Sequence, residues 1–163
     1  VTHSRILIYQ LTTLQDMTPK SIFLAAFFLC AAFGISLAQS PVGTWKTIDD
    51  ETGEAKSHVE IYEQDGKMYG KVVKFLRASA DPDAVCSDCK GAKKNQKIMG
   101  MVIVEALEPY KDYWQDGTIL DPETGKEYGC SIWFDQEGNS DELSVRGKHW
   151  TGLYRTQTWY RVQ

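Results

Sequence analysis

The fold of this chain is decided by residues 57–76, which read SHVEIYEQDGKMYGKVVKFL. Hydrophobic and polar side chains alternate through both halves of the stretch, with Val59 and Ile61 on one face of the first half. Alternation with a period of two residues is typical of a β-strand with one buried face. Between the halves, Asp65-Gly66 signals a tight turn, because glycine adopts the positive φ that such a turn needs. The stretch therefore predicts an antiparallel hairpin.

The same alternation recurs on both sides of this hairpin, between clusters of Gly, Asp and Pro. Because no long stretch has a helical period, the chain is predicted to be all-β. Sequential hairpins that give about eight strands close most naturally into a single antiparallel up-and-down barrel, which leaves no exposed strand edge. Residues 110–115 are predicted to form a loop or one helical turn, anchored by Trp114. The strands are predicted at residues 43–48, 57–63, 67–76, 98–107, 117–120, 128–135, 142–147 and 152–162.

The N-terminal part has the features of an export leader. Residues 17–39 contain Lys20, then an apolar run, then small residues at Ser36 and Ala38 that suit signal peptidase. The apolar run is shorter than the roughly 20 residues of a membrane anchor, so cleavage is expected and no transmembrane segment remains after it. Residues 1–16 are interpreted as an upstream extension from a mistaken start. Residues 40–163 then form one β-barrel domain that is periplasmic or secreted.

Charge disfavours one class of partner. The chain has 18 Lys and Arg against 22 Asp and Glu, a net charge of −4 at pH 7. The lysines are dispersed among acidic residues, whereas a protein that binds nucleic acid gathers them in a basic stripe. No nucleic-acid partner is therefore expected.

The cysteines that remain after cleavage are Cys86, Cys89 and Cys130. The first two lie in a polar segment, residues 77–97, which is longer than most connections in a compact domain. In an oxidising compartment a Cys-x-x-Cys pair in such a loop is best interpreted as a disulfide that constrains it. A bond from Cys130 to either partner is the alternative, and the role of Cys130 stays open.

Redox and metal functions are less favoured. Asp81, Asp83 and Asp88 would raise the pKa of the neighbouring thiols and so weaken the thiolate that redox catalysis needs. The third cysteine and the histidines His58 and His149 are too scattered in the sequence for a zinc-binding motif. No metal or other cofactor is expected.

No catalytic motif stands out. The chain contains no nucleophile elbow, zincin motif, P-loop or dinucleotide fingerprint. The acidic run Asp49-Asp50-Glu51 is interpreted as a solvated turn, since its spacing differs from that of a calcium loop. The protein is therefore expected not to be an enzyme.

Two resemblances support the barrel. Gly43-Thr44-Trp45 and Trp159-Tyr160-Arg161 resemble the ends of lipocalin-type barrels. That resemblance implies that the tryptophan of the first strand packs against the arginine of the last and closes one end. Trp45, Trp159 and Arg161 are accordingly expected to be structural.

The whole domain also resembles an exported bacterial family, domain of unknown function family 2147. The resemblance implies a single β domain outside the cytoplasm and no established activity. It rests on GTWKTIDD at 43–50, DGKMYG at 65–70, Cys-x-x-Cys at 86–89, G-x-ILDP-x-x-GK-x-Y at 117–128, VRG at 145–147 and TQTW at 156–159.

A barrel of this size either fills its interior with side chains or holds one small ligand. Along the last strand Arg155 and Gln157 share a face with Trp159 and Arg161. If that face points inward, a buried cation and amide suggest an anionic or amphipathic ligand. Otherwise Arg155 lies at the open rim, and Arg146 is exposed on the neighbouring strand.

The leading prediction is an envelope protein that binds a small apolar or amphipathic molecule. The alternatives are an envelope protein partner held by the loop at residues 77–97 and, less favoured, a thiol redox function. The candidate ligand-binding residues are Tyr128, Arg146, Arg155 and Gln157.

Overall fold

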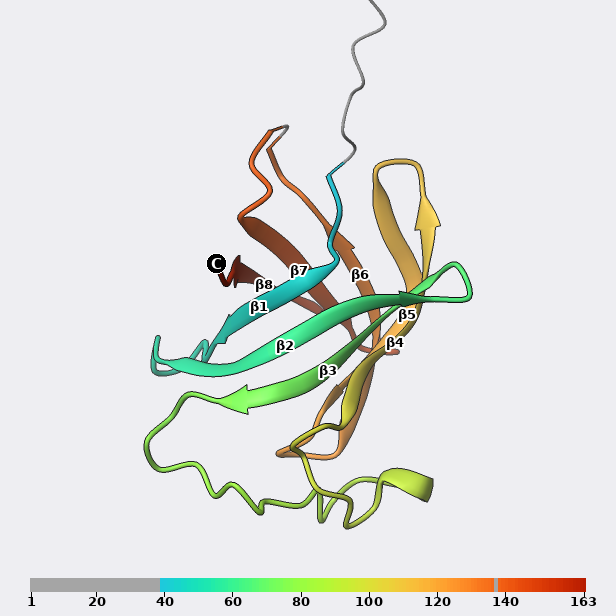
Figure 1. Ribbon diagram of the computed structural model, residues 1–163. Coiled ribbons are helices and arrows are strands. Elements are labelled where there is room, and N and C mark those ends of the chain that lie inside the picture. The colour runs from blue at the N-terminus through green and yellow to red at the C-terminus, as the bar shows by residue number, and fades with distance from the viewer. Residues whose placement is uncertain (1–38, 137) are drawn as a thin grey trace, which may run out of the picture. The chain divides into compact units, whose positions relative to one another are not determined.

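The computed structural model describes residues 39–136 and 138–163, and in this part of the chain eight strands form one closed barrel (Figure 1). Each strand pairs antiparallel with its neighbour in sequence, and the last strand pairs with the first. The predicted all-β up-and-down barrel is confirmed. The predicted extension at 1–16 and leader at 17–39 lie outside the described residues, except for Gln39. The strands are β1 (Gly43–Ile48), β2 (Ala55–Gln64), β3 (Lys67–Phe75), β4 (Val102–Tyr110), β5 (Tyr113–Asp121), β6 (Lys126–Trp133), β7 (Glu142–Lys148) and β8 (Tyr154–Arg161), and a short 3-10 helix, η1 (Gly91–Lys93), lies between β3 and β4.

The hairpin of β2 and β3 forms as its sequence predicts. Gln64 pairs with Lys67, and the two residues between them turn the chain with φ of 52° at Asp65 and 75° at Gly66. Positive φ at both central positions matches the right-handed twist of the flanking strands.

The prediction for residues 110–115 is wrong. These residues belong to a long hairpin in which β4 ends at Tyr110, β5 begins at Tyr113, and Lys111 turns the chain with φ of 55°. Positive φ at Asp116 and a break in the β5–β6 register disturb the alternation that would have marked this strand. Trp114 does anchor the segment, because its ring meets the ring of Phe134 edge-on with 6.4 Å between centroids.

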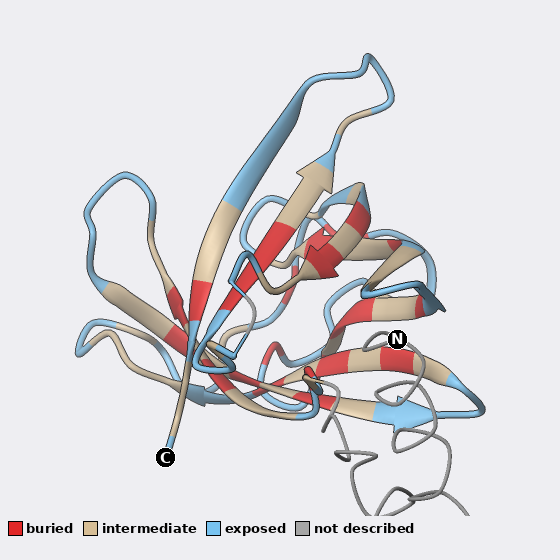
Figure 2. Cartoon of the chain, turned by 90° about the horizontal axis from the view of Figure 1, so that it is seen from above, coloured by how far each residue is buried: buried red, intermediate tan, exposed pale blue. Residues whose placement is uncertain are grey.

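The start of β4 is also later than predicted. Ile98 and Met101 are buried but lie in the β3–β4 connection, which reaches back against β3 through hydrogen bonds from Val72 N to Met101 O and from Gly100 N to Val72 O. The apolar residues that suggested a strand here instead seal this connection to the barrel. Figure 2 shows that buried residues alternate along the strands, whereas the turns are exposed.

At one end of the barrel, Arg161 of β8 stacks on Trp45 of β1. The guanidinium carbon of Arg161 lies 4.3 Å from the centroid of the buried Trp45 ring. The same guanidinium donates hydrogen bonds to the carbonyl oxygens of Ser40 (2.8 Å), Val42 (3.0 Å) and Ser140 (2.7 Å). These bonds tie β8 to the chain before β1 and to the β6–β7 connection.

Gly43 is required at this end. A Cβ atom at this position would lie 2.7 Å from a terminal nitrogen of Arg161, and the φ of 139° is one that side chains rarely adopt. The glycine of the Gly-x-Trp pattern therefore makes room for the arginine of the last strand.

Candidate functional site

The opposite end of the barrel is hollow. A cavity of about 740 Å³ opens between the β1–β2, β3–β4, β5–β6 and β7–β8 connections. A volume in this range suits a small organic ligand. The deeper walls are mainly apolar, with side chains from the β3–β4 connection and from strands on all sides: Val72, Phe75, Ala84, Ile98, Ile103, Ile119, Leu120, Val145 and Trp159.

Ion pairs cross one side of the mouth. Arg77, from the β3–β4 connection, pairs with Asp49 of the β1–β2 turn and with Glu123 of the β5–β6 turn, the latter at 3.2 Å. Lys56 of β2 also pairs with Glu123, at 2.7 Å. The pKa of Asp49 lies below its ordinary value, chiefly because the backbone N–H of Thr52 donates to its carboxylate, with a smaller contribution from Arg77. Three connections are thus joined by charge at the rim.

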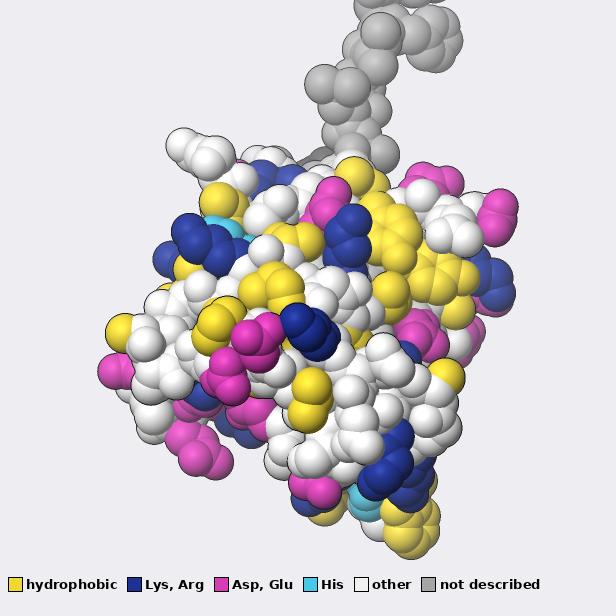
Figure 3. All heavy atoms as spheres, turned by 60° about the horizontal axis from the view of Figure 1, so that its bottom comes forward, with side chains coloured by type: hydrophobic (Ala, Val, Ile, Leu, Met, Phe, Trp, Pro, Cys, Tyr) yellow, Lys and Arg dark blue, Asp and Glu magenta, His cyan; other side chains and the backbone are white. Residues whose placement is uncertain are grey.

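Asp50 organises the other side of the mouth. Its carboxylate pairs with Arg155 and accepts a hydrogen bond from the side-chain amide of Gln157. Gln157 in turn accepts a hydrogen bond from Trp159 Nε1 at 3.2 Å, so the chain of contacts runs from the rim into the apolar interior. In the space-filling view from this end, acidic and basic side chains lie among hydrophobic ones (Figure 3).

Three of the four predicted ligand-binding residues line this cavity: Tyr128, Arg155 and Gln157. Tyr128 reaches the cavity from β6, and Arg155 and Gln157 reach it from the inward face of β8, where Arg155 is mostly exposed and lies at the rim. Both polar groups of β8 already have Asp50 as a partner. The mouth therefore offers a compensated polar rim, with no unpaired cation from β8.

Arg146 lies elsewhere. It is absent from the cavity lining, and its guanidinium lies between the rings of Trp133 (4.7 Å) and Tyr154 (4.5 Å) and donates to Thr156 Oγ1 at 2.9 Å. The neighbouring residue Gly147 lines the cavity instead. Successive side chains of β7 point to opposite faces of the strand, so Arg146 faces outward because Val145 faces inward.

Asp50 and Arg77 are not among the predicted site residues, because Asp50 lies in a run interpreted as a solvated turn and Arg77 stands in no local motif. Asp49 does form the solvated turn that was expected, because its carboxylate accepts from the backbone N–H groups of Glu51 and Thr52 at 2.9 Å. Its pairing with Arg77 joins residues far apart in the chain, and no local pattern marks such a pair.

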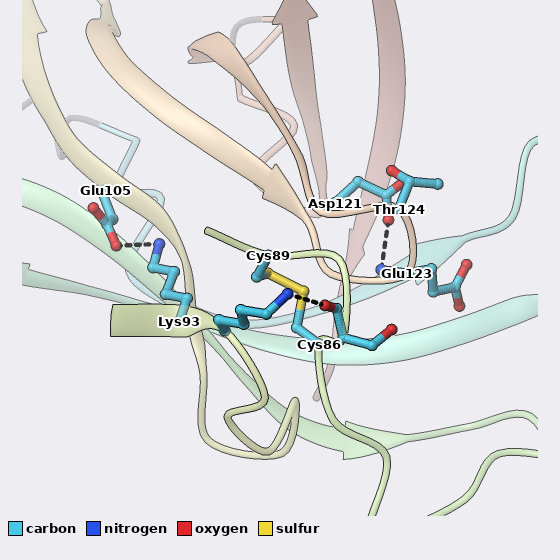
Figure 4. The surroundings of a disulfide bond; sticks show 9 residues. Cys86, Cys89, Lys93, Glu105, Asp121, Glu123 and Thr124 are labelled. Carbon is cyan, nitrogen blue, oxygen red and sulfur yellow. Dashed lines mark hydrogen bonds and ion pairs between the residues drawn. A yellow bond between two sulfur atoms is a disulfide. The ribbon is translucent and has the colours of Figure 1, made fainter. Parts of the chain in front are cut away.

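The predicted disulfide between Cys86 and Cys89 is confirmed. Both cysteines are buried, and the loop that carries them packs against the β5–β6 turn and against β4, where Lys93 pairs with Glu105 at 2.5 Å (Figure 4). The loop contributes Ala84 and Ile98 to the cavity wall. The disulfide therefore supports one side of the cavity.

The third cysteine is a separate, buried thiol. Cys130 is free, and burial raises the pKa of its thiol to about 12. A thiol with so high a pKa is a poor nucleophile at neutral pH.

The histidines lie apart. His149 lies at the mouth of the cavity and its Nδ1 is 2.9 Å from Thr151 Oγ1. The pKa of His58 is lowered, mainly by partial burial and also by Lys74 and Lys46.

In the described part of the chain no three His, Cys, Asp or Glu side chains gather as metal ligands would. No helix of these residues is both long enough and apolar enough to cross a membrane.

Known proteins share this architecture. Protein HP1028 from the human pathogen Helicobacter pylori, described as belonging to the lipocalin family, superposes with a TM-score of 0.64 at 21% sequence identity. The match covers 76% of this chain and 84% of HP1028. At this identity the likeness shows the fold alone, which is a lipocalin-like barrel. No curated protein matches the sequence significantly.

A family model extends over nearly the whole barrel. The model of the uncharacterised proteins conserved in bacteria, DUF2147, matches residues 43–161, from the glycine of β1 that accommodates Arg161 to Arg161 itself. The barrel described above is therefore that of a member of the DUF2147 family, to which this chain belongs.

Proposed function

We propose that the protein is an exported, non-enzymatic carrier that binds a small apolar or amphipathic molecule inside its barrel. The observation that supports this most is the apolar cavity of about 740 Å³, open at one end of a barrel whose other end is closed by Trp45 and Arg161. Closed barrels of about eight strands either fill their interior with side chains or hold one small ligand, and an open apolar cavity favours the second.

The ion pairs at the rim limit which polar groups the ligand can carry. Arg77 and Arg155 are both paired with carboxylates, so an anionic group would have to compete with Asp49 or Asp50 for them. The deeper walls favour a ligand with an apolar body, since burial of apolar surface contributes roughly 25 cal/mol per Å² to the binding free energy. The ligand that fits best has an apolar body inside and a polar end at the rim.

Export is supported by two independent features. Residues 17–39 have the pattern of a cleavable leader. The Cys86–Cys89 disulfide is of a kind that persists in oxidising compartments and is rare in the cytosol.

The test uses two glycines of neighbouring strands that face opposite ways. Gly147 lines the cavity, and a Cβ there would make only ordinary contacts, 3.6 Å from Ile119 and Tyr128. Gly129 is exposed, and a Cβ there would lie 3.7 Å from the carbonyl oxygen of Lys148. Neither has a positive φ, so leucine is sterically possible at both.

We expect wild-type protein to bind an amphipathic fluorescent probe, anilinonaphthalene sulfonate, which has an aromatic body and an anionic end, saturably. Gly147→Leu places an isobutyl side chain in the cavity and should weaken binding at least about tenfold, since it removes room for several apolar contacts. Gly129→Leu should bind as wild type does. Thermal unfolding checks that both variants fold. Equal binding by the three folded proteins would refute the cavity as the site, and absence of binding to wild type would refute the carrier itself.

A further inference from the structure

The β7–β8 turn carries an exposed apolar tip. Trp150 is 89% exposed, Leu153 75% and Tyr154 64%, which makes them the most exposed large hydrophobic side chains of the described residues. Single exposed apolar residues are ordinary on a protein surface, but a contiguous group marks an interaction site.

The tip has a defined conformation. His149 N donates to Leu153 O at 2.7 Å, and Gly152 N donates to His149 O at 2.9 Å. The His149 ring also contacts the hydroxyl of Thr151, with 2.9 Å between Nδ1 and Oγ1. These bonds hold the turn while Trp150 projects into solvent, so the tip is ready to engage a partner without first being ordered.

The segment that carries the tip differs in charge from the rest of the chain, although carboxylates of other turns share the same cavity mouth. The whole chain is acidic, with a net charge of −4, yet residues 143–163 contain Arg146, Lys148, Arg155 and Arg161 and no Asp or Glu. Arg161 belongs to the closed end, and Asp50 partly neutralises Arg155. Lys148 is exposed beside Trp150, and Arg146 stacks on Tyr154 while its charge also helps lower the pKa of Asp135. The tip is therefore both apolar and basic.

The tip also borders the cavity. His149, Leu153 and Tyr154 line its mouth. Any surface that receives Trp150 and Leu153 consequently lies next to the opening through which a ligand passes.

We propose that this tip, residues 148–155, docks the barrel onto an anionic lipid bilayer with the cavity mouth facing the membrane. Trp and Tyr prefer the membrane interface, Leu inserts among acyl chains, and Lys and Arg attract anionic headgroups. This inference rests on the proposed function, which supplies the apolar or amphipathic ligand. That ligand is then a membrane component, which the cavity takes up from the bilayer or delivers to it.

The experiment measures binding of the purified protein to vesicles of phosphatidylcholine with and without phosphatidylglycerol, by co-sedimentation and by Trp fluorescence. The paired change Trp150→Ser with Leu153→Ser should weaken binding to the anionic vesicles at least about tenfold, because it removes the inserted apolar groups. It should also abolish the blue shift of Trp emission. Lys148→Glu should weaken binding roughly fivefold or more and reduce its salt dependence.

Tyr110→Ser is the matched control. Tyr110 is an exposed aromatic at a hairpin turn with Lys111 over its ring, but it lies at the β4–β5 turn, at the other end of the barrel. It should bind vesicles as wild type does. Every variant shares the same N-terminus, so differences among them report on the tip alone.

Equal vesicle binding by wild type and the tip variant would overturn the proposal, as would no binding at all. Dimerisation that the tip variant abolishes, without vesicle binding, would also overturn it and assign the tip to a second copy of the chain. Gly147→Leu separates this inference from the proposed function, because it should weaken probe binding and leave vesicle binding intact.

Discussion

Cys130 on β6 pairs in register with Gly117 of β5 and Gly147 of β7, and its side chain is buried. Burial disfavours the thiolate, which explains the rise of its pKa to about 12. The sequence left the role of this cysteine open because nothing local distinguishes a core thiol from a disulfide partner.

We predict that Cys130 resists alkylation in the folded protein. Its labelling by iodoacetamide at pH 8 should be roughly a hundredfold or more slower than after unfolding in urea, because both access and the thiolate fraction are low. Mass spectrometry of the peptide that contains Cys130 measures this. Rapid labelling under native conditions would show that solvent reaches the thiol and that the core is looser than described.

At the residue scale, strand alternation separates the candidate residues that line the cavity from the one that does not. Gln157, Trp159 and Tyr128 line the cavity, and their roles as ligand-binding or structural residues stay predictions. Arg146 was chosen for its charge, although its alternation with Val145 places it outside. Asp50 and Arg77 were missed because their partners lie on other turns.

Among the elements, the β5–β6 turn and the disulfide loop depend on each other. Gly125 has a φ of 65°, and a Cβ there would lie 2.2 Å from the carbonyl oxygen of Asp88 and 2.7 Å from Cys89 N. The sequence identified both the turn and the loop, but not their contact, because 36 residues separate Gly125 from Cys89 and neither stretch shows what it packs against.

We predict that Gly125→Ala is far more damaging than Gly53→Ala. Gly53 has a similar φ of 72° but nothing within 4 Å of a Cβ, so alanine there should cost only the backbone strain, about 1–2 kcal/mol of unfolding free energy. Gly125→Ala should cost at least about 2 kcal/mol more, because the disulfide loop must move.

Urea unfolding of both variants measures the difference. Gly125→Ala should also make the disulfide reducible by dithiothreitol without denaturant. An equal decrease in unfolding free energy in the two variants would show that the disulfide loop moves at little cost and does not support the cavity wall.

For the molecule as a whole, the barrel closes through a short stretch of pairing between β1 and β8, here called the seam. β1 and β8 share only the pairs Trp45 with Arg161 and Lys46 with Tyr160, whereas β2 and β3 are paired along most of their length. The backbone N–H of Val162 adds a bond to Thr44 O at 2.8 Å, and the three carbonyl contacts of the Arg161 side chain extend the seam.

We predict that Arg161→Lys destabilises the protein by about 2–4 kcal/mol. Lysine retains the charge but cannot reach three carbonyl oxygens in one plane or stack on Trp45 as a guanidinium does. Arg146→Lys is the control, because Arg146 also stacks on aromatic rings but on the outer surface, where the change should cost under about 1 kcal/mol. Denaturant unfolding measures the free energy of unfolding of the two variants. Similar decreases in that free energy would mean that Arg161 does not close the barrel.

By itself, the sequence determined most of the strands, the β2–β3 hairpin turn and the Cys86–Cys89 disulfide, and it identified the Gly-x-Trp residues and the final arginine that meet at one end, but not the β4–β5 hairpin. These follow from short-range signals: the period of two, the turn chemistry of Asp65-Gly66, the spacing of Cys86 and Cys89, and the Gly-x-Trp resemblance. Only the tertiary structure decided that the interior stays open, that Asp49 and Arg77 meet across its mouth, and that Trp150 projects beside it. The physical reason is that an empty volume and a long-range ion pair depend on side chains that come together only when the barrel has closed.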